Sequence, residues 1–236
     1  MSKFVDLHVL PRVDDEISSR KMAEMLRLAG YSTIGLTVPT GLLRDRVTAL
    51  RRLFEGQGIQ TVLRVDLSAT TRAELLRLLR RYRNLYDVVA VKCTNQAVAP
   101  VACRDRRVDL ILLDPRNPRV KFTHPLARLL HGALEFNLIS TFLGEAKSEV
   151  FSRMAKEAGI AREHRSKIVL STGCVSARMV RSPVQLSGIG TAIGLSREQS
   201  NRGVSETPLS IVERNRVRRS RQYVEEGVEL VTVKPR

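Results

Sequence analysis

Two residues whose side chains can bind a metal ion stand near the start of this chain, in the segment KFVDLHVLP at residues 3–11. Asp6 and His8 are two positions apart, a spacing that directs both side chains to the same face of a β-strand. A metal-dependent hydrolase needs a second histidine two positions further on, and Leu10 stands there. The pair is therefore part of an active metal site, the remainder of a site that has lost its metal, or a hydrogen-bonded structural pair at a strand end.

Short apolar segments, rich in Val, Ile and Leu, alternate with amphipathic segments along the chain and would position these side chains. Such near-continuous apolar runs are typical of strands that are buried on both faces, as in a parallel sheet. The predicted strands are 3–8, 33–38, 60–66, 87–92, 108–113, 133–139 and 167–171. The predicted helices are 18–29, 42–55, 72–84, 145–158 and one that begins at about 208.

Strict alternation of strands and helices favours an α/β fold of the TIM-like (β/α) barrel type. An open dinucleotide-binding sheet is disfavoured, because no Gly-x-Gly-x-x-Gly motif follows the first strand. No eighth strand is recognisable between residues 173 and 213, where turns and short helices are expected instead. We therefore expect an irregular barrel with seven clear strands, formed by residues 1–236 as a single domain.

The net charge is the strongest global signal. The chain has 40 basic and 24 acidic residues, a net charge of +16, and 32 of the basic residues are Arg. A planar guanidinium binds phosphate through two parallel hydrogen bonds, so this excess favours a nucleic-acid partner. A GC-rich genome or a hot habitat also raises the Arg content, but neither by itself explains so large a net charge. We expect residues 214–236, which begin with RNRVRRSR, to form a basic tail that is flexible until it binds.

Cysteine usage and hydropathy restrict the compartment. Cys93, Cys103 and Cys174 include no Cys-x-x-Cys pair, which disfavours a zinc site and indicates a reducing environment. No apolar run is long enough for a membrane span, and acidic residues occur where a signal peptide would be apolar. We expect a cytoplasmic protein with no membrane partner.

In a barrel, functional side chains collect where the strands end. The residues at the predicted strand ends include a single histidine, a sparse set for a metal site: Asp6, His8, Thr37, Asp66, Lys92, Thr94, Asp114, Asn137, Ser171 and Thr172. Asp66 and Asp114 could instead cap the loops that follow them. Five basic residues near this rim would together present a positive surface to a folded RNA backbone. They are Lys92, Arg107, Lys121, Arg178 and Arg181.

Six segments, in order along nearly the whole chain, resemble the signature blocks of archaeal ribonuclease P protein component 3, the thirty-kilodalton-type subunit family. They are FVDLHVLP at 4–11, AVKCTN at 90–95, RVDLILLDP at 107–115, ALEFNL at 133–138, IVLSTG followed by ARMVRSP at 177–183, and VSETPLSIVERNR at 204–216. This family is similar to the polymerase-and-histidinol-phosphatase (PHP) barrel hydrolases, whose first motif is His-x-His. The resemblance implies a degenerate metal site at Asp6, His8 and Glu135, with no metal bound and no catalytic residue.

The resemblance implies a subunit of ribonuclease P, the ribonucleoprotein that removes the 5′ leader of precursor tRNA. The RNA subunit, with Mg²⁺, would perform catalysis, and this chain would bind no cofactor. The implied partners are the catalytic RNA, precursor tRNA, ribonuclease P protein component 2 in a two-plus-two heterotetramer, and the other ribonuclease P proteins. Lys92, Arg107, Lys121 and Arg181 lie in or beside the matching blocks and are the expected RNA contacts, together with Arg178.

Two alternatives to an RNA-binding subunit remain open at this point. One is a metal-dependent phosphoesterase of the PHP superfamily, which the acids and the histidine near the rim would support. The other is a scaffold whose positive surface binds acidic proteins. An aromatic content of 4%, with no Trp, disfavours a platform that stacks single-stranded bases. Contacts to phosphate and sugar are therefore expected if the partner is RNA.

Overall fold

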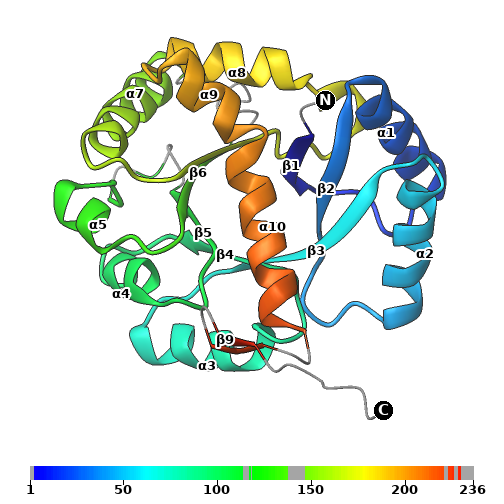
Figure 1. Cartoon of the computed structure of the whole chain (residues 1–236), viewed down its shortest axis with the longest axis horizontal. Coiled ribbons are helices and arrows are strands. Elements are labelled where there is room, and N and C mark those ends of the chain that lie inside the picture. Colours follow the sequence, from blue (N-terminus) through cyan, green and yellow to red (C-terminus); the bar gives the residue numbers. More distant parts are fainter. Residues whose placement is uncertain are drawn as a thin grey trace, which may run out of the picture.

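Seven parallel strands pair in the order of the chain (Figure 1). The computed structural model describes residues 3–113, 117, 119–137, 147–220, 223–225 and 228–229. The strands are β1 (Phe4–Val9), β2 (Tyr31–Thr37), β3 (Gln60–Leu67), β4 (Val88–Cys93), β5 (Leu110–Leu113), β6 (Ala133–Asn137) and β7 (Ile168–Ser171). Each overlaps its predicted range, so the seven strand predictions are confirmed. Residues 138 and 139, predicted to end the sixth strand, lie outside the described part of the chain.

Helices surround the strands and cover one end of the barrel. They are α1 (Glu16–Leu28), α2 (Arg44–Glu55), α3 (Arg72–Tyr82), α4 (Ala99–Arg104), α5 (His124–Leu129), α7 (Lys147–Glu163), α8 (Pro183–Ala192), α9 (Arg197–Gly203) and α10 (Glu206–Arg218), with a 3-10 turn, η1 (Ala177–Met179). The region where no strand was recognisable forms η1, α8 and α9, as the turn-rich sequence predicts. Among the described helices, none is both long and apolar enough to cross a membrane.

Two apolar clusters form the core. The larger cluster packs the outer faces of the strands against the helices. The smaller one fills the barrel interior, where Val5, Leu7, Val88 and other strand residues meet Ile211 and Val212 of α10. Figure 1 shows α10 lying across the ring of strands. Because α10 closes the amino-terminal ends of the strands, the opposite, carboxyl-terminal end is the barrel mouth.

The seam between β1 and β7 explains how seven strands can form a nearly closed barrel. The two strands do not share a ladder, and an isolated bridge joins Val9 of β1 to Cys174, which follows β7. The Leu10 N–H donates to the Cys174 carbonyl at 2.9 Å. The Asp6 carboxylate accepts from the Thr172 N–H at 3.2 Å and from the Thr172 hydroxyl. The Asp6 side chain therefore supplies, at this seam, some of the hydrogen bonds that the backbone of an eighth strand would supply.

The first residues of the expected basic tail belong to the fold. Residues 214–218 are the end of α10, and the Arg214 guanidinium donates to the fully buried Asp109 at 2.8 Å. Arg219 forms an ion pair with Asp87. The prediction of a flexible tail is therefore wrong for residues 214–219, because carboxylates at the amino-terminal end of the barrel hold them. Further on, the described residues form a two-stranded antiparallel sheet, β8 (Tyr223–Glu225) and β9 (Val228–Glu229).

Gly35 in β2 marks a place where the two strands leave no room for a side chain. A Cβ at this position would lie 2.4 Å from the Leu7 carbonyl oxygen of β1. Because the obstructing atom is backbone, we expect Gly35→Ala to lower the free energy of unfolding by about 3 kcal/mol in urea denaturation. The matched control is Gly159→Ala in α7, where no atom lies within 4 Å and the expected change is a gain of about 0.5–1 kcal/mol. Equal losses in the two variants would contradict the steric argument.

Candidate functional site in the barrel mouth

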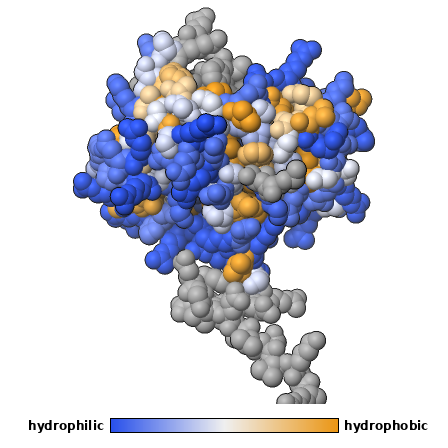
Figure 2. All heavy atoms as spheres, turned by 45° about the horizontal axis from the view of Figure 1, so that its top comes forward, coloured by the Kyte–Doolittle hydropathy of each residue, from blue (hydrophilic) through white to orange (hydrophobic). Residues whose placement is uncertain are grey.

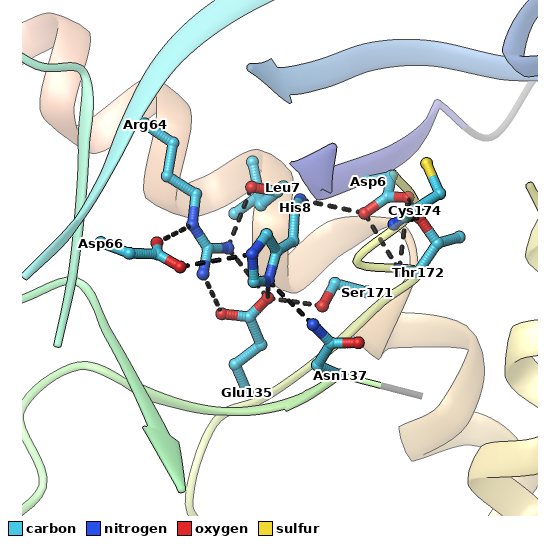
Figure 3. Close-up of polar contacts among 10 residues, drawn as sticks. All are labelled: Asp6, Leu7, His8, Arg64, Asp66, Glu135, Asn137, Ser171, Thr172 and Cys174. Carbon is cyan, nitrogen blue, oxygen red and sulfur yellow. Dashed lines mark hydrogen bonds and ion pairs between the residues drawn. The ribbon is translucent and has the colours of Figure 1, made fainter. Parts of the chain in front are cut away.

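Polar side chains from four strands meet in the barrel mouth (Figure 3). Parallel strands bring their carboxyl ends to one edge, so residues far apart in sequence become neighbours there. Four of the ten residues at the predicted strand ends contact one another or Glu135 there. They are His8 on β1, Asp66 on β3, Asn137 on β6 and Ser171 at the end of β7. Thr172 contacts Asp6 instead. Asp114 lies outside the described residues.

Arg64 is at the centre of this site and is completely buried. Its Nε donates to Asp66 Oδ1 at 2.7 Å, and its Nη1 and Nη2 donate to the two Glu135 carboxylate oxygens at 2.8 and 2.7 Å. Nη1 also donates to the Leu7 carbonyl at 2.9 Å. Burial disfavours the charged guanidinium, but the two carboxylates outweigh burial and raise the Arg64 pKa. A permanent positive charge therefore lies between β1, β3 and β6.

The two carboxylates next to Arg64 are held in their anionic form. Burial would raise the pKa of Glu135, but the charges of Arg64 and His8 lower it to about 2. For Asp66 the same balance between burial and these two neighbours places the pKa well below its usual range. The Ser171 hydroxyl donates a further hydrogen bond to Glu135. Both groups are consequently ionised at neutral pH.

His8 lies between the same two carboxylates. Its Nε2 is 3.3 Å from Asp66 Oδ2, and its Nδ1 is 3.2 Å from both Glu135 Oε1 and the Asn137 amide nitrogen. Burial and the Arg64 charge disfavour the imidazolium, but Glu135 and Asp66 outweigh them and raise the His8 pKa. A raised pKa is the expected response of an imidazole that lies between two carboxylates.

Asp6 does not share this cluster. The register of β1 shifts between Asp6 and Val9, and the Asp6 carboxylate faces the seam with β7. It accepts from the backbone N–H of His8 at 3.0 Å, and no hydrogen bond or ion pair joins it to the imidazole among the described contacts. The prediction that both side chains point the same way from a regular strand is therefore wrong. Of the three interpretations of this pair, the structural one fits Asp6.

The pH dependence of stability should reveal the buried Asp6. Burial, despite hydrogen bonds from Thr172 and His8, raises its pKa from 3.8 to about 6. The folded chain thus binds this proton more tightly, so the contribution to stability is complete below pH 4 and is lost as the pH rises through 6. We expect a decrease of about 3 kcal/mol over this window in urea denaturation, and a much flatter profile for Asp6→Asn. An unchanged slope in Asp6→Asn would refute the assignment to Asp6.

The mouth does not fit a metal ion as it stands. No group of three or more His, Cys, Asp or Glu side chains in the described part of the chain is arranged to hold one. In the mouth, the Arg64 guanidinium is in direct contact with Glu135 and Asp66, the carboxylates that would have to bind the metal. Cys93, Cys103 and Cys174 are free and buried.

Arg64 is the site residue that the sequence analysis did not single out. A signal was present, because an Arg inside a buried parallel strand must find a charged partner. Arg64 is also two positions before Asp66, so both side chains project from β3 on the same face. What no local pattern indicates is the contact with Glu135, which lies 71 residues further along the chain. The alternative that Asp66 caps a loop is not supported, since its carboxylate contacts Arg64 and His8.

The five basic residues predicted to bind RNA do not share one rim. Lys92 ends β4 near the mouth and is exposed. Lys121 is exposed as well, and its N–H donates to Gln96 in the loop that follows β4. Arg107 precedes β5, which places it at the opposite end of the barrel, and its guanidinium is bound by Asp105 at 2.6 and 2.9 Å. The predicted placement of Arg107 near the mouth is therefore wrong.

Arg178 and Arg181 lie at and just after η1, in the outer layer of the barrel. Both side chains are exposed. The turn η1 packs against α1, and the Tyr31 hydroxyl donates to the Arg181 carbonyl at 2.9 Å. The Arg181 guanidinium donates to the carbonyls of Arg178 and Val180. These two residues therefore form a basic turn of fixed conformation beside α1.

A family model described as RNase P subunit p30 matches residues 3–220 of this chain. The chain belongs to the RNase P subunit p30 family. Curated relatives agree with this assignment over nearly the full length. Ribonuclease P protein component 3 of Methanococcoides burtonii is 25% identical over 241 residues, which cover 98% of this chain and 95% of the relative. The corresponding protein of Methanothermobacter thermautotrophicus is 26% identical over 225 residues and 90% of each chain.

Solved structures with the same fold place this p30-family chain among TIM-like barrels. A chain in the cryo-EM structure of archaeal ribonuclease P with mature tRNA superimposes with a TM-score of 0.83 at 15% identity, covering 98% of this chain and 100% of that one. Histidinol phosphate phosphatase from Lactococcus lactis, solved with zinc, L-histidinol and phosphate, gives 0.57 at 13% identity, with 82% and 95% covered. The predicted PHP-like barrel is confirmed as a fold.

Proposed function

We propose that this p30-family chain is a non-catalytic, RNA-binding subunit of ribonuclease P that supports the RNA which removes the 5′ leader of precursor tRNA. The observation that carries the proposal is the family match across residues 3–220. The charge of +16 agrees with a polyanionic partner. In the face shown in Figure 2, hydrophilic side chains dominate and hydrophobic ones are scattered in small patches, which suits contact with phosphate and sugar.

The partners and the metal follow from the same proposal. The p30-like chain of the cryo-EM structure belongs to archaeal ribonuclease P with bound tRNA, which supports catalytic RNA, precursor tRNA and other ribonuclease P proteins as partners here. A two-plus-two heterotetramer with ribonuclease P protein component 2, and a cytoplasmic location, stay predictions. We assign the catalytic Mg²⁺ to the RNA subunit. The mouth supports this assignment, because Arg64 engages the carboxylates that would bind a metal.

Lys92 and Lys121 are the exposed members of the proposed RNA contacts near the mouth, and Arg178 and Arg181 are exposed in the outer layer beside α1. Arg107 stays a prediction of lower priority, because its guanidinium is already bound by Asp105. An internal ion pair reduces the gain that a phosphate contact would bring. The proposed surface therefore consists of Lys92, Lys121, Arg178 and Arg181.

Charge reversal near the mouth should weaken RNA binding in a salt-dependent manner. We expect Lys92→Glu with Lys121→Glu to raise the Kd for the catalytic RNA about tenfold or more. The slope of log Kd against log salt concentration should fall by about two, one for each phosphate that a lysine no longer neutralises. Filter binding over a KCl series would measure both quantities. The matched control is Lys156→Glu with Lys167→Glu, two exposed lysines on α7 and just before β7. A slope unchanged in the first variant, or lowered equally in the control, would contradict the surface.

Reconstitution of ribonuclease P with and without this chain tests the proposed function directly. At low Mg²⁺ concentration, we expect precursor-tRNA cleavage to depend on the chain, because a protein that binds the RNA backbone replaces part of the ion atmosphere. The chain alone should cleave neither precursor tRNA nor a model phosphodiester in the presence of Mn²⁺ or Zn²⁺. Hydrolysis by the chain alone that Glu135→Gln abolishes would instead establish the phosphoesterase.

A further inference from the structure

Four oxygen atoms from three strands surround the Arg64 guanidinium, each hydrogen-bonded to one of its nitrogen atoms. We propose that its guanidinium is a built-in cation which takes the place of a divalent metal in the barrel mouth, and that it covers a latent divalent-cation site formed by Asp66, Glu135 and the Leu7 carbonyl. The inference concerns the chemistry of the mouth and does not depend on which RNA the chain binds.

The donor atoms around the guanidinium carry the first step. Asp66 Oδ1 and Glu135 Oε2 lie 2.7 Å from its nitrogen atoms, Glu135 Oε1 lies at 2.8 Å and the Leu7 carbonyl oxygen at 2.9 Å. These oxygens come from β3, β6 and β1 and surround the guanidinium in Figure 3. Carboxylate and carbonyl oxygens are the ligands that Mg²⁺, Mn²⁺ and Ca²⁺ prefer. The space that the guanidinium fills is therefore enclosed by a hard-cation donor set.

The charge balance carries the second step. Glu135 is fully buried and Asp66 largely so, with 23% of its side chain exposed. Ionised carboxylates in such positions need nearby positive charge, because desolvation is otherwise too costly. The Arg64 guanidinium supplies this charge at 2.7 Å from both carboxylates. It therefore meets part of the electrostatic requirement that a metal ion satisfies elsewhere.

The same contacts explain why the native mouth excludes a metal ion. The guanidinium is within hydrogen-bond distance of both carboxylates, which leaves no space for an ion between them. His8 also has each ring nitrogen beside a different carboxylate, so neither nitrogen is directed at a common centre. Replacing Arg64 with alanine would both remove the guanidinium and open the space between the Asp66 and Glu135 carboxylates. Water would then complete the coordination sphere of a bound ion.

The test is Arg64→Ala in the full chain, titrated with Mn²⁺ while electron paramagnetic resonance reports the free ion. We expect one Mn²⁺ to bind per chain, at least tenfold more tightly than any binding by the wild type, and the Tm to rise with Mn²⁺ in the variant alone. Two matched controls define the site. Arg64→Lys keeps a cation and should bind no Mn²⁺, whereas Arg64→Ala with Glu135→Gln loses one carboxylate and should bind at least tenfold more weakly than Arg64→Ala.

Three results would overturn the proposal. The first is Arg64→Ala binding Mn²⁺ no more tightly than the wild type. The second is binding that does not change when Glu135 becomes Gln. The third is a wild-type chain that binds one Mn²⁺ in a manner dependent on Glu135. If Arg64→Ala is unfolded without the ion, refolding in Mn²⁺ decides the question. Recovery of the native circular dichroism spectrum would support the latent site. The proposal is refuted if Arg64→Ala does not recover this spectrum in Mn²⁺ although the double variant Arg64→Ala with Glu135→Gln folds.

Discussion

Replacing Arg64 with methionine is expected to lower the free energy of unfolding by about 3–5 kcal/mol at pH 7. Methionine keeps much of the side-chain volume but removes the charge, so Glu135 and Asp66 lose the guanidinium that hydrogen-bonds to them inside the barrel. The cost comes from leaving buried carboxylates with too little positive charge rather than from a cavity. Urea denaturation followed by circular dichroism would measure the loss.

A second substitution separates the charge effect from any packing defect. Adding Glu135→Gln to Arg64→Met removes one uncompensated charge, so the double variant should regain a large part of the lost stability. Arg46→Met is the matched control, because Arg46 pairs with Asp14 where their side chains are 53% and 84% exposed. An ion pair so exposed contributes at most about 1 kcal/mol. Similar losses in Arg64→Met and Arg46→Met would show that the buried network has no special role.

Asp6→Ala is expected to open the seam of the barrel and to lower the free energy of unfolding by about 2–4 kcal/mol, since the substitution leaves the N–H groups of Thr172 and His8 without their acceptor. Each buried unsatisfied donor costs about 1–3 kcal/mol. Burial of the ionised Asp6 carboxylate at neutral pH destabilises the native chain, and removing this carboxylate therefore offsets part of the loss. Urea denaturation would measure the change in stability.

Hydrogen exchange would show where this effect is located. We expect the Thr172 and Leu10 amides at the seam to lose more protection in Asp6→Ala than the Val62 amide inside the β2–β3 ladder. Asp14→Ala is the matched control, since the exposed Asp14 carboxylate pairs only with Arg46 among the described contacts. A uniform loss of protection over the whole sheet would mean that Asp6 contributes to global stability without closing the seam.

The positions of the strands and the contents of the mouth could be predicted because both are local properties. A strand buried on both faces is typically an almost uninterrupted apolar segment, and β4, β5 and β7 show this most clearly. In a parallel barrel, the residue that ends such a segment lies at the mouth, whichever residues it contacts there. For this reason Asp66, Asn137 and Ser171 were placed correctly without knowledge of their partners.

Other features depended on how distant strands pack. The sequence by itself determined the barrel, its polar mouth and the family. Only the tertiary structure decided that Asp6 turns to the β7 seam, that Arg64 meets Glu135, and that Arg107 lies at the other end of the barrel. The physical reason is that a charged side chain pairs with whichever opposite charge lies near it across β1, β3 and β6. Which charges lie near one another depends on strand register and on closure of the barrel. No local spacing of residues specifies either of these.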